Sequence, residues 1–397
     1  MSSQGGFAEP EGRDKGPSPA GASKADGKPA LRLAYLDGLR AVAAAYVVMF
    51  HAVLGFSAQE LSGPWRVMRR AFAFGHEAVA IFIVLSGYVL MLPVVRRDPT
   101  RLPVDFAKFV KRRAFRILPP YFVALLLSLA LIGALPVLRT TGTGTIWDNS
   151  LPAFEAGTVV SHLLLLHNWS PAWGYRINGP LWSVASEWQI YFFFPLVLLP
   201  VWRRLGPMAA LVVAALLGFA PLLISVAASH VAIPWYLLLF TFGMAAAALG
   251  FSSLPWATRV RERLPFGWLC AGLWGVCLVF SMGFGQIWFR QKALTDVLVG
   301  LASAALLLYL TSRASADGAA RGLLLRGLES RPLVALGHFS YSLYLTHLPI
   351  VALCYFGLRG SLTGAPLALS LLGTSFVASL AVGYAFHVAV ERRFIHK

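Results

Sequence analysis

Long apolar runs separated by short polar stretches follow one another from Leu33 almost to the end of the chain. A helix needs about 20 residues, at a rise of about 1.5 Å each, to cross roughly 30 Å of hydrocarbon. Ten runs are of about that length and are predicted to be membrane-spanning helices, over residues 33–56, 78–95, 117–137, 181–201, 208–228, 233–251, 265–284, 293–311, 337–357 and 366–390. The pattern therefore predicts an all-α, polytopic membrane protein.

Two other segments lack a spanning run. Residues 1–31 are rich in Gly, Pro, Ser, Ala and Lys and contain almost no large apolar side chain, which predicts a disordered tail ahead of a single transmembrane domain over residues 32–397. Residues 158–168 are apolar but too few to span a bilayer. We expect a short re-entrant or interfacial helix there.

The composition agrees with a membrane location. Hydrophobic residues make up 57% of the 397 residues and charged residues only 13%, whereas soluble domains carry about 25% charged residues. A soluble protein of this length would divide into domains that each need a charged surface. The composition therefore excludes a soluble enzyme.

The net charge of +17, from 34 Lys+Arg and 17 Asp+Glu, would suggest nucleic-acid binding in a soluble protein. Here 25 of the basic residues fall on the side of the predicted spans that holds both termini, and 8 fall on the other side. This bias follows the positive-inside rule, so both termini are predicted to be cytoplasmic and no nucleic-acid partner is expected.

The first predicted span contains Asp37, Arg40 and His51. A charge inside a bilayer costs about 2.5–3.5 kcal/mol on insertion scales, so such residues are candidates for function. Arg40 and His51 are eleven residues apart, or about three helical turns, and so share one face at a separation of about 16 Å. In the structural alternative, Arg40 extends to the headgroups with Asp37 as its partner, and His51 is an interfacial residue.

The fourth predicted span begins with Ser183, Glu187 and Tyr191 on one face, four residues apart. Glu187 has no basic neighbour in the sequence, so it must pair with another helix, be protonated or face water. Alternatively, it is a helix-start carboxylate that is stabilised by the helix dipole.

His347 lies near the middle of the ninth predicted span, with Ser340 and Tyr344 on the same face. Pro349 is expected to loosen this helix and to free backbone carbonyls. A structural role, in which a hydroxyl group satisfies the imidazole, is the alternative.

Arg113 and Arg116 are one turn apart at the cytoplasmic end of the third predicted span. Such a patch suits anionic lipids, and it equally suits the phosphates of a nucleotide-containing donor, because Arg binds phosphate through a bidentate fork. The sequence has no glycine-rich phosphate loop of the Walker or Rossmann type.

The sequence contains two weaker signals. His162 and His167 are five residues apart and lack further ligands, so no metal site is predicted. His76 and Glu77 fall near the predicted outer end of the first span and are secondary candidates for the site of His51.

Six segments, in order, carry a resemblance to a known family: LDGLRAVAAAYVVMFH, AIFIVLSGYVL, RRAFRILPPYF, LWSVASEWQIYFFFP, FSYSLYLTHLPI and VERRF. From Leu33 to Phe394 the chain resembles the acyltransferase-3 family of integral membrane acyltransferases, whose first helix carries an Arg and a His separated by ten residues. It departs from the family at Trp188, where many members have a second acid, at Ala80, where many have Asp or Gln, and at Thr346, where Trp is common.

The resemblance implies transfer of an acyl group, usually acetyl, from acyl-CoA to a hydroxyl group, most often on a cell-surface carbohydrate. It implies that His51 is the catalytic base and that Arg40, Arg113 and Arg116 hold the donor. Glu187 would orient the imidazole or hold sugar hydroxyls, and His347, Tyr344 and Ser183 would bind substrate. The expected partners are acyl-CoA, a carbohydrate acceptor and lipids of a bacterial inner membrane, with neither a metal nor a bound cofactor.

A transporter or flippase for a lipid-linked saccharide is the alternative function, because buried polar residues suit it as well. The two halves of the sequence show no paired Gly/Pro-broken segments that would indicate inverted repeats. Consumption of acyl-CoA by the purified protein would distinguish the two functions.

Overall fold

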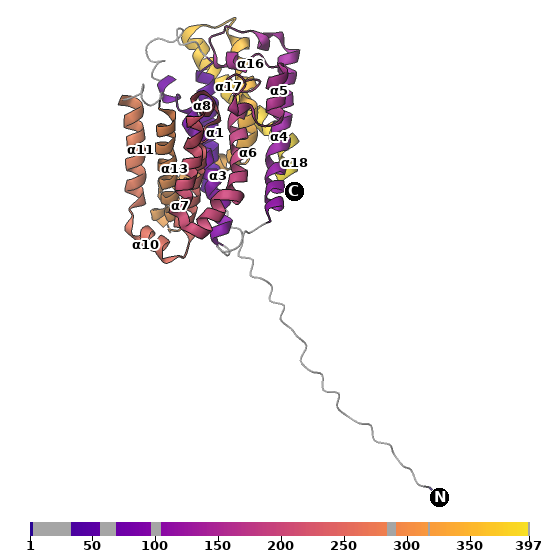
Figure 1. Cartoon of the computed structure of the whole chain (residues 1–397). Coiled ribbons are helices and arrows are strands. Elements are labelled where there is room, and N and C mark those ends of the chain that lie inside the picture. Colours follow the sequence, from indigo (N-terminus) through magenta and orange to yellow (C-terminus); the bar gives the residue numbers. More distant parts are fainter. Residues whose placement is uncertain (3–32, 56–68, 97–104, 284–290, 317, 396–397) are drawn as a thin grey trace. The chain divides into compact units, whose positions relative to one another are not determined.

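A computed structural model describes residues 1–2, 33–55, 69–96, 105–283, 291–316 and 318–395 (Figure 1). The chain divides into two units, Met1–Leu33 and Ala34–Lys397. Most of the predicted tail, residues 3–31, lies outside the described residues.

The described residues of the second unit form helices and connecting turns, without a strand. The α-helices are α1 (Ala34–Val53), α3 (Gly75–Arg96), α4 (Phe106–Ala134), α5 (Ala156–Leu163), α6 (Leu181–Phe193), α7 (Leu199–Phe219), α8 (Val226–Ala232), α9 (Tyr236–Phe251), α10 (Pro255–Arg263), α11 (Phe266–Gly283), α13 (Lys292–Ala314), α14 (Gly322–Leu328), α15 (Arg331–His338), α16 (Ser340–Leu358), α17 (Gly364–Phe386) and α18 (Arg392–Ile395). Short 3₁₀ or π turns are η1 (Pro136–Arg139), η2 (Ile146–Ser150), η3 (His167–Trp169), η4 (Phe194–Leu198), η5 (Ala220–Leu223), η6 (Gly318–Arg321) and η7 (His387–Glu391).

Among the described residues, eight helical segments are long and apolar enough to span a membrane, and α10 with α11, bent by 71°, makes a ninth. Two predicted spans, 181–201 and 208–228, fall largely in one run of 43 residues, Leu181–Leu223. At 1.5 Å per residue this run is about 65 Å long, twice the hydrocarbon thickness. Gly206, with φ 88°, breaks it between the two predicted spans. The all-α, polytopic prediction is confirmed.

Helix α1 lies within the bundle, where it packs against α3, α15, α16 and α17 (Figure 1). Helices α3 and α9 pack closely because glycines face the opposing backbone. A Cβ atom on Gly87 would lie 1.9 Å from the carbonyl oxygen of Phe240, and one on Gly243 would lie 2.0 Å from that of Val84. These two glycines allow the backbones to approach as small residues do in membrane helix pairs.

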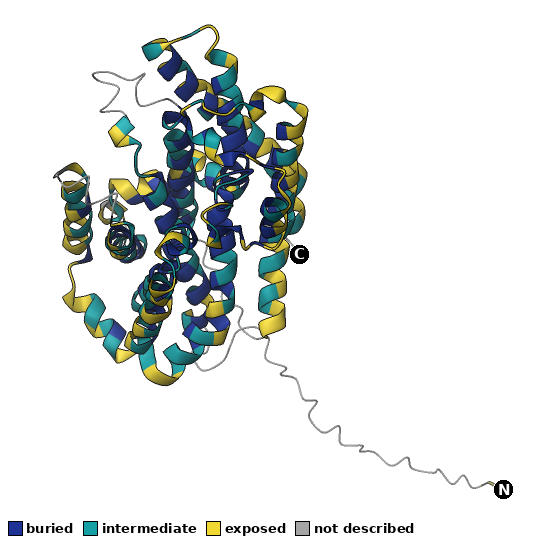
Figure 2. Cartoon of the chain, turned by 45° about the horizontal axis from the view of Figure 1, so that its top comes forward, coloured by how far each residue is buried: buried dark blue, intermediate teal, exposed yellow. Residues whose placement is uncertain are grey.

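The interior of the bundle is buried and residues on its outer helix faces are exposed (Figure 2). Many of the exposed side chains are large and apolar. On α11, for example, Trp268 is 81% exposed and Met282 is 78% exposed. Exposed apolar surface of this kind is a liability in water but is the expected surface toward lipid. The chain is an integral membrane protein.

The start of the third predicted span differs from the structure, and the short helix expected near residues 158–168 is present. Helix α4 begins at Phe106, eleven residues before the predicted start of the third span, so Arg113 and Arg116 lie within the helix. The short helix expected over residues 158–168 is present as α5 and the turn η3.

Candidate active site

The imidazole rings of His51, near the end of α1, and His347, in α16, are in direct contact. The Nε2 atom of His347 lies 3.0 Å from Nδ1 of His51, and the ring centroids are 4.8 Å apart. Both side chains are buried, with residue exposures of 9% for His51 and 0% for His347. The structure therefore brings together two residues that are 296 positions apart in the sequence.

Backbone carbonyls determine which nitrogens of this pair carry protons. A carbonyl oxygen only accepts, so Nδ1 of His347, 2.8 Å from the carbonyl of Tyr344, carries a hydrogen, and its Nε2 is an acceptor. Nδ1 of His51 lies 2.9 Å from the carbonyl of Val47 and faces the acceptor Nε2 of His347. It therefore carries a hydrogen too. In neutral His51 the unprotonated nitrogen is thus Nε2.

Helix α16 is continuous through Pro349. The backbone carbonyl that loses its helical hydrogen bond at this proline accepts one from another part of the chain. Pro349 has no N–H to donate to Leu345, four residues earlier. The amide group of Asn178 donates to the Leu345 carbonyl at 2.9 Å instead. The loop before α6 is thereby held against the helix that carries His347.

Tyr344 and Ser183, both predicted to bind substrate, also meet. Their hydroxyl oxygens are 2.7 Å apart, and the Tyr344 hydroxyl also donates to the carbonyl of Pro180 at 3.2 Å. The ring of Tyr344 lies 5.8 Å from that of His347. Ser340, predicted to share the face of His347, instead donates to the carbonyl of Gly337 at 2.8 Å.

Glu187 makes different contacts from those expected of a group that orients the imidazole. One of its carboxylate oxygens accepts hydrogen bonds from the hydroxyl groups of Ser86 and Tyr191. The polar contact of the His51 ring is instead with the ring of His347. Glu187 is also near enough to Arg113 and to Tyr344 to interact electrostatically with both.

The three arginines predicted to hold the donor form one cluster. Arg40 interacts electrostatically with Arg116, and Arg113 interacts with both of them. Arg113 also lies over the ring of Tyr191, 5.8 Å from its centroid. Arg40 pairs with Asp37 at 3.0 Å, as the structural alternative predicted, and both side chains are 21% exposed. Arg40 and Asp37 are therefore only partly buried, and the three guanidinium groups give this end of the site a local positive charge.

Polar groups consequently follow one another along the inside of the bundle. They run from the arginines to Tyr191 and Glu187, then to Ser183 with Tyr344, and on to the histidine pair. The arginine end corresponds to the predicted cytoplasmic side. The sequence had not indicated Ser86 or Asn178, because neither is charged and neither belongs to a periodic polar face.

The remaining histidines lie elsewhere. The rings of His162 and His167 are stacked, with centroids 3.8 Å apart and an interplanar angle of 9°. Within the described residues no group of three potential ligands is placed to hold a metal ion. His76 pairs with Asp296 at 3.0 Å. Asp296 lies in the predicted span 293–311, so the cost of an intramembrane charge could have singled it out in the sequence.

Comparison with known proteins identifies the family of the chain. The family model described as an acyltransferase domain, Acyl_transf_3, matches residues 33–387. The chain belongs to this acyltransferase family. It is an enzyme that transfers acyl groups, which argues against the transporter alternative.

Curated relatives are similar over different lengths. The acyltransferase MdmB of Streptomyces mycarofaciens is 28% identical over 91% of this chain and 91% of its own length. The putative peptidoglycan O-acetyltransferase YrhL of Bacillus subtilis is 28% identical over 41% of this chain and 23% of its own length. The O-acetyltransferase OatA of Staphylococcus aureus (strain NCTC 8325 / PS 47) is 26% identical over 43% of this chain and 26% of its own length. No solved structure is significantly similar to this chain.

Proposed function

We propose that this acyltransferase moves an acyl group, acetyl in the first instance, from acyl-CoA to a hydroxyl group of a cell-surface carbohydrate or a related glycoside at a bacterial inner membrane. The observation that carries the proposal is the contact of His51 Nδ1 with the Val47 carbonyl and with Nε2 of His347, which leaves the lone pair of neutral His51 on Nε2. The names of two relatives, a peptidoglycan O-acetyltransferase and an O-acetyltransferase, support a hydroxyl acceptor.

In the proposed reaction, Nε2 of His51 accepts the proton of the acceptor hydroxyl as a general base. The hydroxyl oxygen forms a bond to the thioester carbonyl carbon, and the bond from that carbon to sulfur breaks. The sulfur leaves with the bonding electrons and takes the proton from the imidazolium of His51. The products are an ester and the free thiol of CoA, and the histidine is neutral again.

His347 has a positioning role in this mechanism. Its Nε2 accepts the Nδ1 hydrogen of His51, which fixes the ring and directs basicity to the opposite nitrogen. When His51 becomes charged, the same lone pair and the Val47 carbonyl stabilise the Nδ1–H of the imidazolium. The pair lies in a buried environment, which limits hydrolysis of the thioester by water.

The arginine cluster has the charge and the position to hold the phosphates of acyl-CoA. Arg40 and His51 lie on one helix, eleven residues or about 16 Å apart, so the arm between the phosphates and the thioester would run along α1. Glu187, which neighbours Arg113, would limit the positive charge of the cluster before the donor binds.

The test uses the purified protein in lipid nanodiscs with acetyl-CoA, and it measures the release of free thiol. His51→Ala is expected to lower acetyl transfer by about 10²–10⁴-fold, the usual contribution of a general base. His230→Ala, on α8, is the matched control and is expected to retain the rate. Normal insertion of His51→Ala with wild-type transfer would disprove the proposed base.

The acceptor can be identified separately. Mass spectrometry of surface glycans from a strain that lacks this protein is expected to show the loss of one acyl mass from one class of glycan. The missing mass gives the acyl group, and the glycan that loses it gives the acceptor. Glycans identical to those of the parent strain would contradict a surface acceptor.

A further inference from the structure

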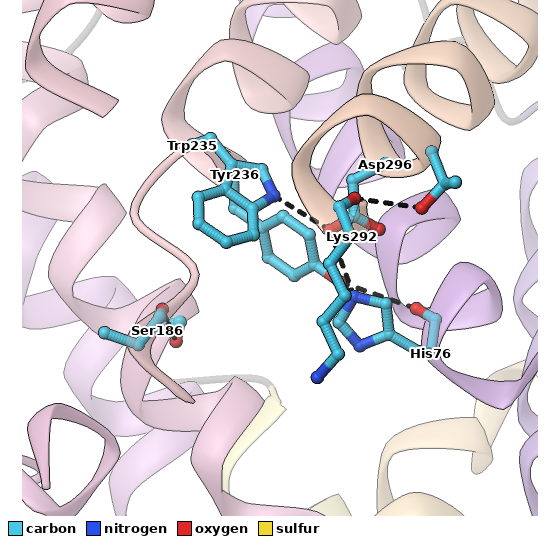
Figure 3. A network of polar contacts seen from close by, with 8 residues as sticks. His76, Ser186, Trp235, Tyr236, Lys292 and Asp296 are labelled. Carbon is cyan, nitrogen blue, oxygen red and sulfur yellow. Dashed lines mark hydrogen bonds and ion pairs between the residues drawn. The ribbon is translucent and has the colours of Figure 1, made fainter. Parts of the chain in front are cut away.

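A second histidine-centred cluster lies at the start of α3 and α13, on the predicted outer side (Figure 3). His76 Nε2 is 3.0 Å from a carboxylate oxygen of Asp296, and the indole N–H of Trp235 donates to the same oxygen at 2.8 Å. The hydroxyl group of Tyr236 lies 3.4 Å from Nε2 and from the carbonyl oxygen of His76. The mechanism proposed above uses none of these residues.

The carboxylate determines the tautomer of His76. An ionised carboxylate only accepts, so Nε2 of His76 carries a hydrogen, and in the neutral imidazole Nδ1 keeps the lone pair. The side chain of Asp296 is fully buried, whereas that of His76 is 19% exposed. The second oxygen of Asp296, Oδ1, has no hydrogen-bond partner among the described residues. The imidazole of His76 is thus partly exposed, and the buried acid holds it in place.

Neighbouring side chains surround the imidazole of His76. The ring of Trp182 stacks on that of His76 with centroids 5.7 Å apart and an interplanar angle of 19°. The ring of Tyr236 lies 5.9 Å from it. Lys292 extends beside the imidazole (Figure 3) and interacts with it electrostatically. An acceptor nitrogen, an ammonium group and aromatic surfaces suit a polyhydroxylated ring with an apolar face.

This cluster adjoins the proposed base along two helices. Gly75, which precedes His76, packs against Phe50, since a Cβ atom on Gly75 would lie 2.2 Å from that ring. Phe50 in turn precedes His51, and their rings are 4.9 Å apart.

The second connection runs through α6. Trp182, which stacks on His76, is followed by Ser183, whose hydroxyl contacts Tyr344 beside His347. Consecutive residues on α1 and on α6 thus join the two histidine clusters.

We propose that His76 and Asp296 form an acceptor-anchoring site, which holds a second hydroxyl group of a polyhydroxylated acceptor while His51 takes the proton from the reacting one. This inference rests on the proposed function, since it assigns the acceptor side of the same reaction. The hydroxyl group donates to Nδ1 of His76, and no covalent bond changes there. The anchor fixes which hydroxyl group reaches His51 and selects sugars over simple alcohols.

The experiment compares two acceptors that share an apolar tail, octyl β-D-glucopyranoside and 1-octanol, in nanodiscs with acetyl-CoA. His76→Leu and Asp296→Asn are expected to lower kcat/KM for the glucoside at least tenfold, mainly through KM, and to leave transfer to octanol unchanged. His76→Asn, whose amide oxygen replaces Nδ1 as an acceptor, is expected to recover part of the loss. NMR of the product is expected to show acetyl spread over several hydroxyl groups in His76→Leu.

The control is His230→Leu. The ring centroid of His230 lies 6.0 Å from that of Trp235, but His230 makes no contact with His76 or Asp296 that is described above. This variant is expected to leave both rates unchanged. Equal losses on both acceptors in His76→Leu would show that the contact between His76 and Asp296 is purely structural and would overturn the inference. So would an unchanged rate on the glucoside.

Wild-type protein that consumes no acetyl-CoA with any acceptor would contradict the proposed function rather than the anchor. Saturation-transfer NMR with methyl β-D-glucopyranoside then tests the anchor alone. Saturation transfer from the wild-type protein to the sugar, with none from His76→Leu, supports the anchor. The anchor is overturned if the wild type shows no saturation transfer, or if His76→Leu shows as much as the wild type.

Discussion

Nε2 of His347 accepts the Nδ1 hydrogen of His51 at 3.0 Å, across the contact between α1 and α16. The Val47 carbonyl lies 2.9 Å from the same Nδ1 atom. Two acceptors on one side of the ring leave the other ring nitrogen as the basic one. The relationship therefore explains how an imidazole without a carboxylate partner is held in one tautomer.

His347→Leu removes this acceptor and is expected to lower kcat by about 10²–10³-fold, because the His51 ring loses its fixed tautomer and orientation. His347→Gln offers an amide oxygen to Nδ1 of His51 and is expected to retain more of the rate. Steady-state kinetics with acetyl-CoA measure both variants. Equal rates in the two would show that packing, and not the hydrogen bond, explains the loss.

Arg113→Gln is expected to raise the KM for acetyl-CoA by about tenfold or more, since a lost charge-assisted hydrogen bond costs roughly 1.5–3 kcal/mol. The KM for the acceptor should not change. Arg112→Gln, an exposed neighbour on the same helix, is the control and should have wild-type constants. An equal effect of both substitutions would indicate general attraction of the donor to a basic surface.

The sequence predicted the helices well, because membrane-spanning length is a property of local composition. It also placed the residues of each polar face, since a helix fixes which positions share a face. The sequence could not predict contacts between helices. The pairing of His51 with His347 depends on how the helices pack, and so does the contact of Glu187 with Ser86. The contact of Glu187 with Tyr191 lies within one helix.

The helix boundaries show a second limit. Helix α4 begins at Phe106 because the basic stretch before the span contains several Ala, Lys and Arg residues, which are good helix formers, whereas the apolar run alone indicated a later start. The 43-residue run over Leu181–Leu223 contains two predicted spans, and the bend between them depends on the backbone at Gly206.

Gly87→Ala is expected to destabilise the protein strongly, because the added Cβ atom would lie 1.9 Å from a backbone oxygen of α9. Overpacking usually costs about 1–3 kcal/mol, and a backbone atom cannot swing away as a side chain does. Thermal unfolding in detergent, followed by tryptophan fluorescence, measures the effect. Gly272→Ala on α11, where no atom lies within 4 Å of the new Cβ, is the control and should unfold at or slightly above the wild-type temperature.

The stacked pair of His162 and His167 predicts a loss of stability in acid. Burial lowers the pKa of His162 to about 4 and that of His167 well below its usual value. Both residues lie outside the spanning helices. The unfolded chain, with a histidine pKa of about 6.5, therefore binds more protons than the folded one as the pH falls from about 6.5 to about 4. Each proton taken up only on unfolding lowers stability by about 1.4 kcal/mol per pH unit.

The double variant His162→Phe, His167→Phe keeps two stacked rings and removes both titrating groups. We expect its unfolding temperature to depend less on pH between 6.5 and 4 than that of the wild type, while the two proteins are similar at pH 7.5. Differential scanning calorimetry in nanodiscs measures both profiles. The acid sensitivity arises elsewhere if the two curves stay parallel, because the stacked rings would then bind protons equally in both states.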